Sequence, residues 1–358
     1  MQFIPVSPDQ PNLPLAPRLL AELCQEKGIK LTLDSEFFYF GYIETEDGNR
    51  FPIKGGAFAL NSYAAGEAAK DKDFCGRLLQ DADLPTPDFK LIHSDKAIRQ
   101  LSTANPHVAQ SLNTLTKAPA IAEALGYPLF IKPNEGTQGV GVQKISDEAE
   151  LNAHLTAALQ TNDRMLVQEA VSGRDYRVIV LDGTILAIIE RRPLSITGDG
   201  THTIAELLSE KIKTLTTRSG GYKVESDDPR ILKAIQEAGY ELTSILSDGE
   251  LLQLLSNANL STGGEAVDVT NIASQSFKDL AVEAARVCGL RYAGVDILCE
   301  DLSINDAPAT CLNSMQVPAS PTSGRPLLSI ITVSAPFIGV YWKPCSNNQL
   351  DCNVILLQ

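Results

Sequence analysis

The sequence predicts a chain that combines α/β units with antiparallel α+β lobes. Helical and strand patterns alternate along its 358 residues. Two Asp-Gly pairs, Asp47-Gly48 and Asp182-Gly183, each lie between apolar runs, which indicates tight hairpins between antiparallel strands. The length allows two or three packed units with their own cores. Because hairpins are frequent, a plain doubly wound parallel sheet is not expected.

Residues 1–70 are expected to form a small N-terminal α/β unit. Their first helical pattern ends at Gly28, and the first of the two hairpins follows it. The next helix is expected to stop before Pro85, with a strand after it. A helical, partly polar stretch then covers about residues 94–125.

The segment YPLFIKPNEGTQGVGVQKI, residues 127–145, predicts a strand, a glycine-rich loop and a second strand. Gly136, Gly139 and Gly141 let the backbone turn tightly and approach a ligand closely. Exposed N–H groups in such a loop can surround phosphate oxygens, and Lys132 on the preceding strand can add a positive charge. The alternative is a hairpin with a flexible turn and a surface lysine. The loop matches neither the P-loop pattern nor the dinucleotide-binding fingerprint.

The second half of the chain continues the alternation. After a helix and the strand RMLVQEAV comes the second hairpin, and the segment DGTHTIAELLSEKIKTL opens a helix with a capping signal. The long helix SQSFKDLAVEAARVCGL precedes the strand YAGVDILCED. We expect four parts, namely an N-terminal unit, a first lobe with the glycine-rich loop, a second lobe and an atypical tail, at residues 1–70, 71–172, 173–310 and 311–358.

The composition limits the classes of function. The chain carries 44 Asp and Glu residues against 30 Lys and Arg residues, a net charge of −14, which argues against a non-specific nucleic-acid binder and a basic membrane-surface protein. No apolar run reaches the roughly 20 residues of a membrane span, and the start lacks a signal-peptide pattern. Seven scattered cysteines favour reduced thiols, and the four histidines are too dispersed for a metal cluster. We expect a cytoplasmic protein without nucleic-acid or membrane partners; the sequence leaves a homo-oligomer open.

Three polar residues stand at the ends of predicted elements. Lys72 opens a helix, and Gln168 and Glu169 end a strand. Such a strand end can offer backbone groups to an adenine edge and a carboxylate to ribose hydroxyls. The structural alternatives are a surface charge for Lys72 and an edge-strand charge for Glu169.

Charged residues also interrupt two apolar strands of the second lobe. Asp175 and Arg177 follow a glycine turn, and Asp296 lies inside the strand GVDIL. A carboxylate there is costly unless it is paired or bound to a metal. A helix-capping or paired acid is the structural alternative for Asp296.

In this order along the chain, these features resemble the ATP-grasp superfamily over roughly residues 65–310. The resemblance implies a fold of two lobes that clasp ATP, with ATP and Mg²⁺ as ligands. It assigns two lysines to phosphate contacts, a glycine loop to the phosphates, and a hinge to adenine and ribose. Asp296 matches the first magnesium-ligand carboxylate. The implied nucleotide-binding residues are Lys72, Lys132, Gly136, Thr137, Gln138, Gly139, Gln168, Glu169, Ala170, Val171 and Asp175.

Two segments narrow the resemblance. DYRVIVLDGTILAIIERRPLSITGDGTHTIAELL and NANLSTGGEAVDVT are similar to the ligase part of cyanophycin synthetases and bifunctional glutathione synthetases, and the glutamate ligases that modify ribosomal protein share this outline. The resemblance implies a ligase that joins a carboxylate to an amine through an acyl phosphate, on amino-acid or peptide substrates. Arg177 and Arg191 would hold the carboxylate or the developing acyl phosphate. The implied acceptor-site residues are Asn259, Gly263 and Gly264.

The chain departs from these relatives at two places. They usually have an Arg before the NAN motif, where this chain has Leu255-Ser256. They also have a later strand reading roughly Leu-Glu-Ile-Asn-Ala-x-Pro-Gly, whose Glu and Asn complete the magnesium site. This chain reads INDAPATCLNSMQVPASPTSG instead.

The genetic code suggests a reason for the second departure. Codons for residues 311–320, read from the third base of the Cys311 codon, permit Leu-Glu-Phe-Asn-Ala-Ser-Pro-Gly-Leu. Residues 311–358 carry only three charged residues, Arg325, Lys343 and Asp351. We interpret this tail as the product of a shifted reading frame. The alternative is a divergent apolar C-terminal unit.

Two other functions stay open from the sequence. One is a D-alanine–D-alanine-type ligase, against which the segments GDGTHTI and NANLSTGG speak. The other is a nucleotide-binding protein without catalysis, because the altered tail would take two expected ligands from magnesium. The sequence names neither the acid nor the amine.

Overall fold

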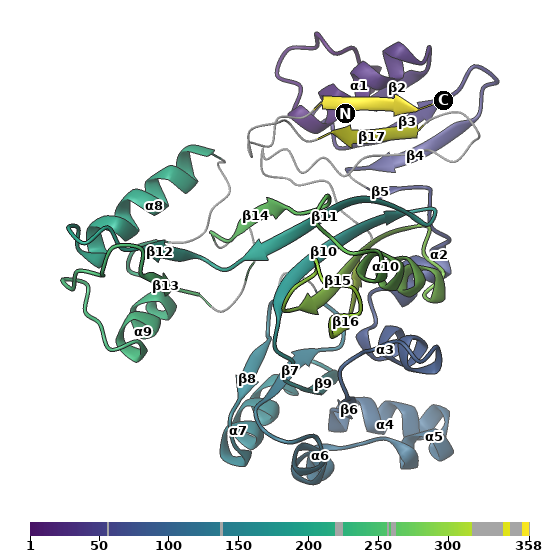
Figure 1. Cartoon of the computed structure of the whole chain (residues 1–358). Helices are drawn as coiled ribbons and strands as arrows, with labels where there is room; N and C mark the ends of the chain where they lie inside the picture. Colours follow the sequence, from purple (N-terminus) through teal and green to yellow (C-terminus); the bar gives the residue numbers. More distant parts are fainter. Residues whose placement is uncertain are drawn as a thin grey trace. The chain divides into compact units, whose positions relative to one another are not determined.

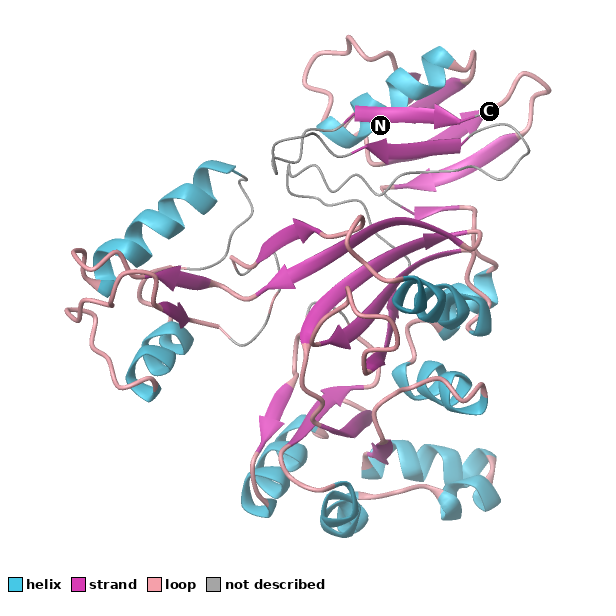
Figure 2. Ribbon diagram, in the orientation of Figure 1, coloured by secondary structure: helices cyan, strands magenta, loops and turns pink. Residues whose placement is uncertain are grey.

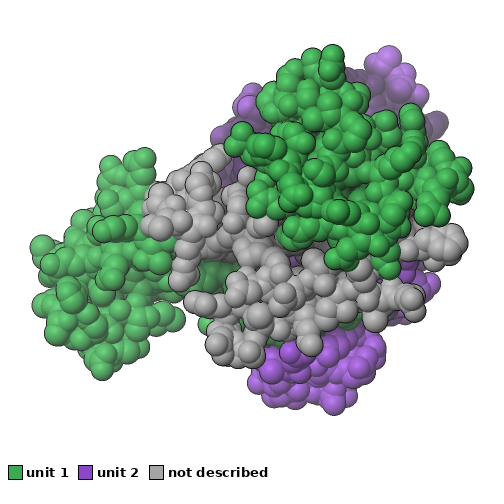
Figure 3. Space-filling view, turned by 90° about the horizontal axis from the view of Figure 1, so that it is seen from above, with its two compact units in different colours: residues 1–62, 184–270, 317–358 green, residues 63–183, 271–316 purple. Residues whose placement is uncertain are grey.

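A computed structural model of the chain describes residues 1–55, 57–136, 139–218, 225–255, 258, 263–316, 339–343 and 353–357. The chain divides into two compact units, which Figure 3 shows in different colours. The first unit comprises residues 1–62, 184–270 and 317–358, and the second comprises residues 63–183 and 271–316. Each unit is therefore assembled from segments that lie far apart in the sequence.

The N-terminal segment of the first unit forms an antiparallel five-stranded sheet and one helix, drawn in purple tones in Figure 1. The hairpin predicted at Asp47-Gly48 is confirmed, because Phe40 pairs with Lys54 across that turn. Gly48 has a φ of +82°, which favours glycine there. The elements are β1 (Phe3–Pro5), α1 (Leu15–Glu26), β2 (Lys30–Asp34), β3 (Phe40–Glu44), β4 (Arg50–Lys54) and β5 (Ala57–Phe58).

The central segment of the first unit has a small apolar core of its own. Leu194, Leu208, Ile231 and Leu252 are among its buried members. The predicted capping signal is confirmed, since the Thr203 N–H donates to the Glu206 carboxylate at 2.8 Å and the Glu206 N–H donates to the Thr203 hydroxyl at 3.3 Å. The elements are β11 (Thr184–Arg192), β12 (Ser195–Thr197), α8 (Ile204–Arg218), α9 (Pro229–Glu237), β13 (Leu251–Gln253) and β14 (Glu265–Asp268).

Strand pairing in this segment is antiparallel. β11 pairs with β14, and β12 pairs with β13. In the tail, β17 (Gly339–Lys343) and β18 (Asn353–Leu357) pair with each other.

The second unit contains an antiparallel four-stranded sheet in the order β6-β9-β7-β8 (Figure 2). One face of this sheet packs against two helices, α6 and α7, through Leu129 and Ile131 of β7 and Met165 and Val167 of β9. The two strands predicted on either side of the glycine loop are confirmed as β7 and β8. The elements are α2 (Tyr63–Ala68), α3 (Lys72–Asp81), β6 (Phe89–His93), α4 (Asp95–Ala104), α5 (Pro106–Ser111), the 3-10 helix η1 (Leu115–Lys117), α6 (Ala118–Leu125), β7 (Leu129–Pro133), β8 (Gln143–Ile145), α7 (Glu148–Ala158) and β9 (Arg164–Glu169).

A second set of antiparallel strands in this unit runs in the order β10-β15-β16. The ring of Tyr176 on β10 lies 5.5 Å from the ring of Phe277 on the helix α10, so α10 lies on that face of the strands. The pairing of β15 with β16 shifts between Val295 and Ile297. The elements are β10 (Arg174–Leu181), α10 (Gln275–Val287), β15 (Tyr292–Cys299) and β16 (Ala309–Gln316). Within the described ranges, no helix has both the length and the apolar character needed to cross a bilayer.

Candidate functional site

Lys132 and Gln168 lie on the face of the four-stranded sheet that points away from α6 and α7. Neighbouring strand residues alternate between faces, and Leu129, Ile131 and Val167 all point toward the helices. Lys132 is only 9% exposed and Gln168 only 3%. A buried ammonium and a buried amide on one face of the sheet make this face suited to a polar ligand.

The ammonium of Lys132 lies among other charges. Its pKa is lowered to about 7, first by burial and then by the positive charge of Lys72, against the opposing effect of the Asp296 carboxylate. Burial likewise lowers the pKa of Lys72. Two buried lysines that repel each other are stabilised by a multiply charged anion, which makes this region a candidate phosphate site.

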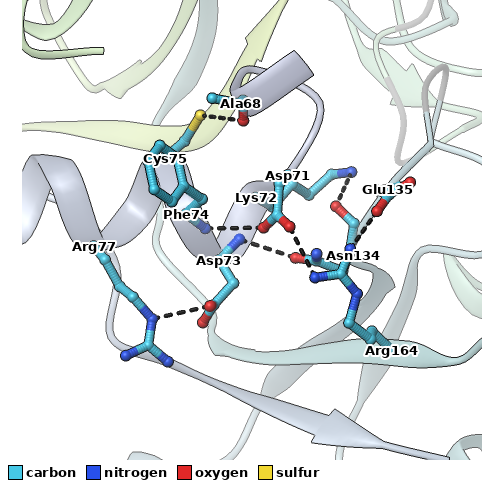
Figure 4. Close-up of polar contacts among 10 residues, drawn as sticks. All are labelled: Ala68, Asp71, Lys72, Asp73, Phe74, Cys75, Arg77, Asn134, Glu135 and Arg164. Carbon is cyan, nitrogen blue, oxygen red and sulfur yellow. Dashed lines mark hydrogen bonds and ion pairs between the residues drawn. The ribbon is translucent and has the colours of Figure 1, made fainter. Parts of the chain in front are cut away.

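Lys72 is held against the first residues of the glycine loop, residues 134–142. Its Nζ donates to the backbone oxygens of Asn134 at 3.2 Å and of Gly136 at 3.1 Å (Figure 4). The buried Asn134 side chain accepts from the Asp73 N–H at 2.9 Å, and the Lys72 N–H donates to the Asn134 backbone oxygen at 3.2 Å. An ammonium has three donors, so two loop contacts leave Lys72 able to bind a further acceptor. The N-terminus of α3 and the glycine loop thus form one unit of structure.

The end of β9 is tied to neighbouring segments through Glu169. Its side chain accepts a hydrogen bond from the Asp88 N–H at 2.9 Å, and its N–H donates to the Asp88 oxygen at 3.0 Å. The next N–H, of Ala170, donates to the Pro128 oxygen at 3.3 Å. The Val171 N–H then donates to no group in the described residues. A fixed strand end followed by an open backbone donor can hydrogen-bond the edge of a planar base.

Asp175, Arg177 and Asp296 share the face of β10 and β15 that points away from α10. Arg177 lies directly opposite Asp296 in the strand register. The Arg177 Nε donates to Asp296 Oδ1 at 2.7 Å, and Nη2 donates to Oδ2 at 2.9 Å. With Asp296 only 4% exposed, this is a buried two-point ion pair. The structural alternative of a paired acid is therefore realised, and the role of Asp296 as a metal ligand stays a prediction.

The donor set for magnesium can be tested against these contacts. No group of three or more His, Cys, Asp or Glu side chains that could hold a metal occurs among the described residues. Asp296 offers one carboxylate, and both its oxygens accept from Arg177. Magnesium is usually held by one or two carboxylates together with substrate phosphates. Asp296 fits as a single protein ligand to an ion that arrives with a nucleotide, and not as a metal site made by the protein alone.

Other predicted site residues lie in the first unit or outside the described residues. Arg191 lies on β11, opposite Ala266 of β14. Gly263 has a φ of +86°, and a Cβ on Gly264 would lie 2.7 Å from the Ala258 oxygen, so the backbone itself requires glycine at both positions. The remaining three, Thr137, Gln138 and Asn259, lie outside the described residues.

Sequence reasoning missed four residues that organise the site. Asn134 connects α3 to the glycine loop, and Arg164 forms ion pairs with both Asp71 and Glu135. Asn134 and Glu135 directly follow the Lys-Pro of β7, so their place in the motif was the available signal. Arg164 and Asp71 gave no signal, because their pairing depends on how distant segments fold together.

Comparison with known proteins places these features in context. The profile of the family described as the D-ala D-ala ligase C-terminus matches residues 78–198. Cyanophycin synthetase of Trichormus variabilis is 34% identical over 243 residues, a match that covers 66% of this chain and 25% of that protein. The glutathione biosynthesis bifunctional protein of Mannheimia succiniciproducens is 32% identical over 228 residues, covering 59% of this chain and 30% of that protein. The chain therefore spans about a quarter to a third of these curated relatives.

A solved structure shares the architecture over most of the chain. The crystal structure of a bifunctional glutathione synthetase from Pasteurella multocida matches with a TM-score of 0.56 and 23% sequence identity. The match covers 87% of this chain and 41% of that chain. At this identity, the similarity shows the fold alone.

Proposed function

We propose that this chain is an ATP- and magnesium-dependent ligase that joins a carboxylate to an amine. The proposal starts from its ATP-grasp fold and from its resemblance to the ligase part of cyanophycin synthetases and bifunctional glutathione synthetases. The observation that carries the proposal is the convergence of Lys72, Lys132 and the glycine loop beside Asp296. Buried cations beside such a loop suit the triphosphate of ATP.

Each part of the site has a proposed role. Lys72, Lys132 and the backbone of the glycine loop bind the phosphates, and Asp175 binds the ribose hydroxyls. The hinge at Gln168–Val171 binds the base through its backbone and the Gln168 amide. Asp296 gives one carboxylate ligand to magnesium, which when bound would neutralise charge on the phosphates.

The proposed reaction has two steps. A carboxylate oxygen of the acid attacks the terminal phosphorus of ATP, the bond to the bridging oxygen breaks, and ADP leaves. The amine nitrogen then attacks the acyl carbon, the bond from that carbon to the oxygen bridging it to phosphorus breaks, phosphate leaves with the bridging oxygen, and the nitrogen gives up a proton. The lysines contribute by neutralising the phosphates and holding them in line with the acid. Arg177 and Arg191 are proposed to hold the acid or the acyl phosphate.

The proposed substrates are amino acids or peptides. The curated relatives are a synthetase of cyanophycin and a protein of glutathione biosynthesis, and both names denote amino-acid-derived products. Asn259, Gly263 and Gly264 are proposed to lie near the amine. We further propose that residues 311–358 derive from a shifted reading frame, and that the four parts given above are the functional divisions of the chain.

A second candidate is a nucleotide-binding protein without catalysis. It is favoured by the engagement of both Asp296 oxygens with Arg177. Calorimetric titration with ATP, with and without magnesium, beside an ADP-release assay over a panel of amino acids and dipeptides separates the candidates. ATP binding with substrate-dependent ADP release supports the ligase, binding without release supports the second candidate, and no ATP binding contradicts both.

A further inference from the structure

Arg164 joins two segments that carry proposed phosphate-binding groups. Its Nη1 donates to Asp71 Oδ2 at 2.9 Å, and its Nη2 pairs with Glu135 (Figure 4). Asp71 caps α3, because its carboxylate accepts from the Phe74 N–H at 2.9 Å, and Lys72 is the next residue. Glu135 belongs to the glycine loop. One guanidinium therefore links the helix that carries Lys72 to the loop.

The strand pairing explains why Arg164 stands at this point. It is the first residue of β9, and its backbone oxygen accepts from the Asn134 N–H at 3.1 Å, where the glycine loop leaves β7. From here its side chain reaches carboxylates on both segments. A guanidinium can donate in two directions from one plane, whereas the ammonium of a lysine is a single compact charge.

Other contacts between the same two segments run alongside this link. Lys72 Nζ donates to the backbone oxygens of Asn134 and Gly136, and Asn134 Oδ1 accepts from the Asp73 N–H. In the close-up, the Arg164 guanidinium lies beside these contacts and reaches the carboxylates of Asp71 and Glu135 (Figure 4). The position of Lys72 relative to the loop is thus held both by its own ammonium and by Arg164.

We propose that Arg164 is a positioning residue that holds Lys72 and the glycine loop in their phosphate-binding arrangement before the nucleotide arrives. The proposal rests on the proposed function, and it assigns Arg164 no contact with ATP. The Arg164 side chain is 36% exposed and that of Glu135 is 63% exposed, so added salt should weaken the link.

The test compares ATP with adenosine. The Arg164→Gln variant should bind ATP about five- to tenfold more weakly, because two partly exposed ion pairs are lost, while its affinity for adenosine stays within about twofold. Adenosine has the base and ribose that the proposed hinge binds but no phosphates, so a general loss of stability would weaken the binding of both ligands alike. Arg291→Gln is the matched control, since Arg291 makes a two-point pair with Asp182 at 2.6 and 2.7 Å elsewhere in the same unit. It should leave both affinities unchanged.

Two isosteric variants test the link itself. Asp71→Asn removes the charge but keeps a residue type that caps helices well, and Glu135→Gln removes the charge from the loop. Each should weaken ATP binding in the wild-type background and have little further effect in the Arg164→Gln background. In the nucleotide-free protein, amide hydrogen exchange at Glu135, Gly136 and Gly139 should be faster in Arg164→Gln than in wild type.

The outcomes separate this inference from the proposed function. Wild-type protein that fails to bind ATP contradicts the proposed function, and the hydrogen-exchange measurement still decides whether Arg164 holds the loop. Wild-type ATP binding with an unchanged Arg164→Gln affinity, or with equal losses for ATP and adenosine, overturns the positioning role and leaves the proposed function standing. Unchanged exchange at the three loop amides also overturns it.

Discussion

Raising the pH from 6 to 8.5 should weaken ATP binding and couple it to proton uptake, because Lys132 must be charged to hold phosphate. Burial and the charge of Lys72 lower the Lys132 pKa to about 7 in the nucleotide-free protein. A bound triphosphate would favour the charged ammonium and raise this pKa again. The protein therefore has to take up a proton when ATP binds above neutral pH.

The size of the effect follows from that pKa. At pH 8.5, about 1.5 pH units above it, about 97% of Lys132 is neutral in the free protein. Charging it costs about 2 kcal/mol, which corresponds to ATP binding about thirtyfold weaker than at pH 6, with nearly one proton taken up per ATP. The terminal phosphate, with a pKa near 6, is already ionised at this pH and contributes little.

Calorimetric titrations at pH 8.5 in two buffers of different ionisation enthalpy measure the proton uptake directly. Lys132→Met, which has a neutral side chain of similar length, should bind ATP weakly at both pH values and take up no proton at pH 8.5. Equal wild-type affinity at pH 6 and pH 8.5, with no proton uptake, would refute the reasoning and remove Lys132 from the phosphate site.

Four further predictions concern Lys132, the buried ion pair, the proposed ribose site and the tail. The Lys132 pKa lies below its value of about 10.4 in an unfolded chain, so its contribution to the stability of the nucleotide-free fold is present above pH 10.4 and is lost as the pH falls toward 7. In urea unfolding, the free energy of unfolding should therefore rise from pH 7 to pH 10 in wild type and not in Lys132→Met. Arg177→Met should cost about 3–5 kcal/mol in urea unfolding, because it leaves the buried Asp296 carboxylate without its guanidinium, and adding Asp296→Asn should restore part of that loss. Asp175→Ala should weaken ATP and GTP binding alike, and a change in base preference at constant ATP affinity would remove Asp175 from the ribose site. Shifting the reading frame back within codons 305–311 should speed ADP release, whereas equal activity of the two proteins would contradict the frameshift.

The local patterns of the fold could be predicted from the sequence. The two strands beside Gly136 were predicted from apolar runs on either side of a glycine-spaced turn, and the Asp47-Gly48 hairpin from its turn residues. The boundaries of the compact units follow from contacts between distant segments. The first unit joins residues 1–62 to residues 184–270, and no local pattern carries that information.

The residues of the site likewise divide into those that the sequence could predict singly and those whose contacts depend on the fold. Lys72, Lys132 and Asp296 were selected as single residues, because charged groups in apolar or helix-start positions stand out. The pairing of Arg177 with Asp296 joins residues 119 apart, and that of Arg164 with Asp71 joins residues 93 apart. Such contacts depend on the register between β10 and β15 and on where β9 begins beside the loop, which propensity and spacing do not determine.

The proposed ligase chemistry is tested most directly by trapping its acyl phosphate. Hydroxylamine replaces the amine in reactions with ATP, magnesium and a panel of amino acids and dipeptides, and hydroxamate and ADP are measured together. The chain as it stands and the version with its frame shifted back within codons 305–311 are assayed side by side. An acyl phosphate predicts one hydroxamate per ADP with at least one acid, formed faster by the frame-shifted version. ADP formed without hydroxamate, or no ATP consumption by either protein with any acid, would contradict a carboxylate–amine ligase.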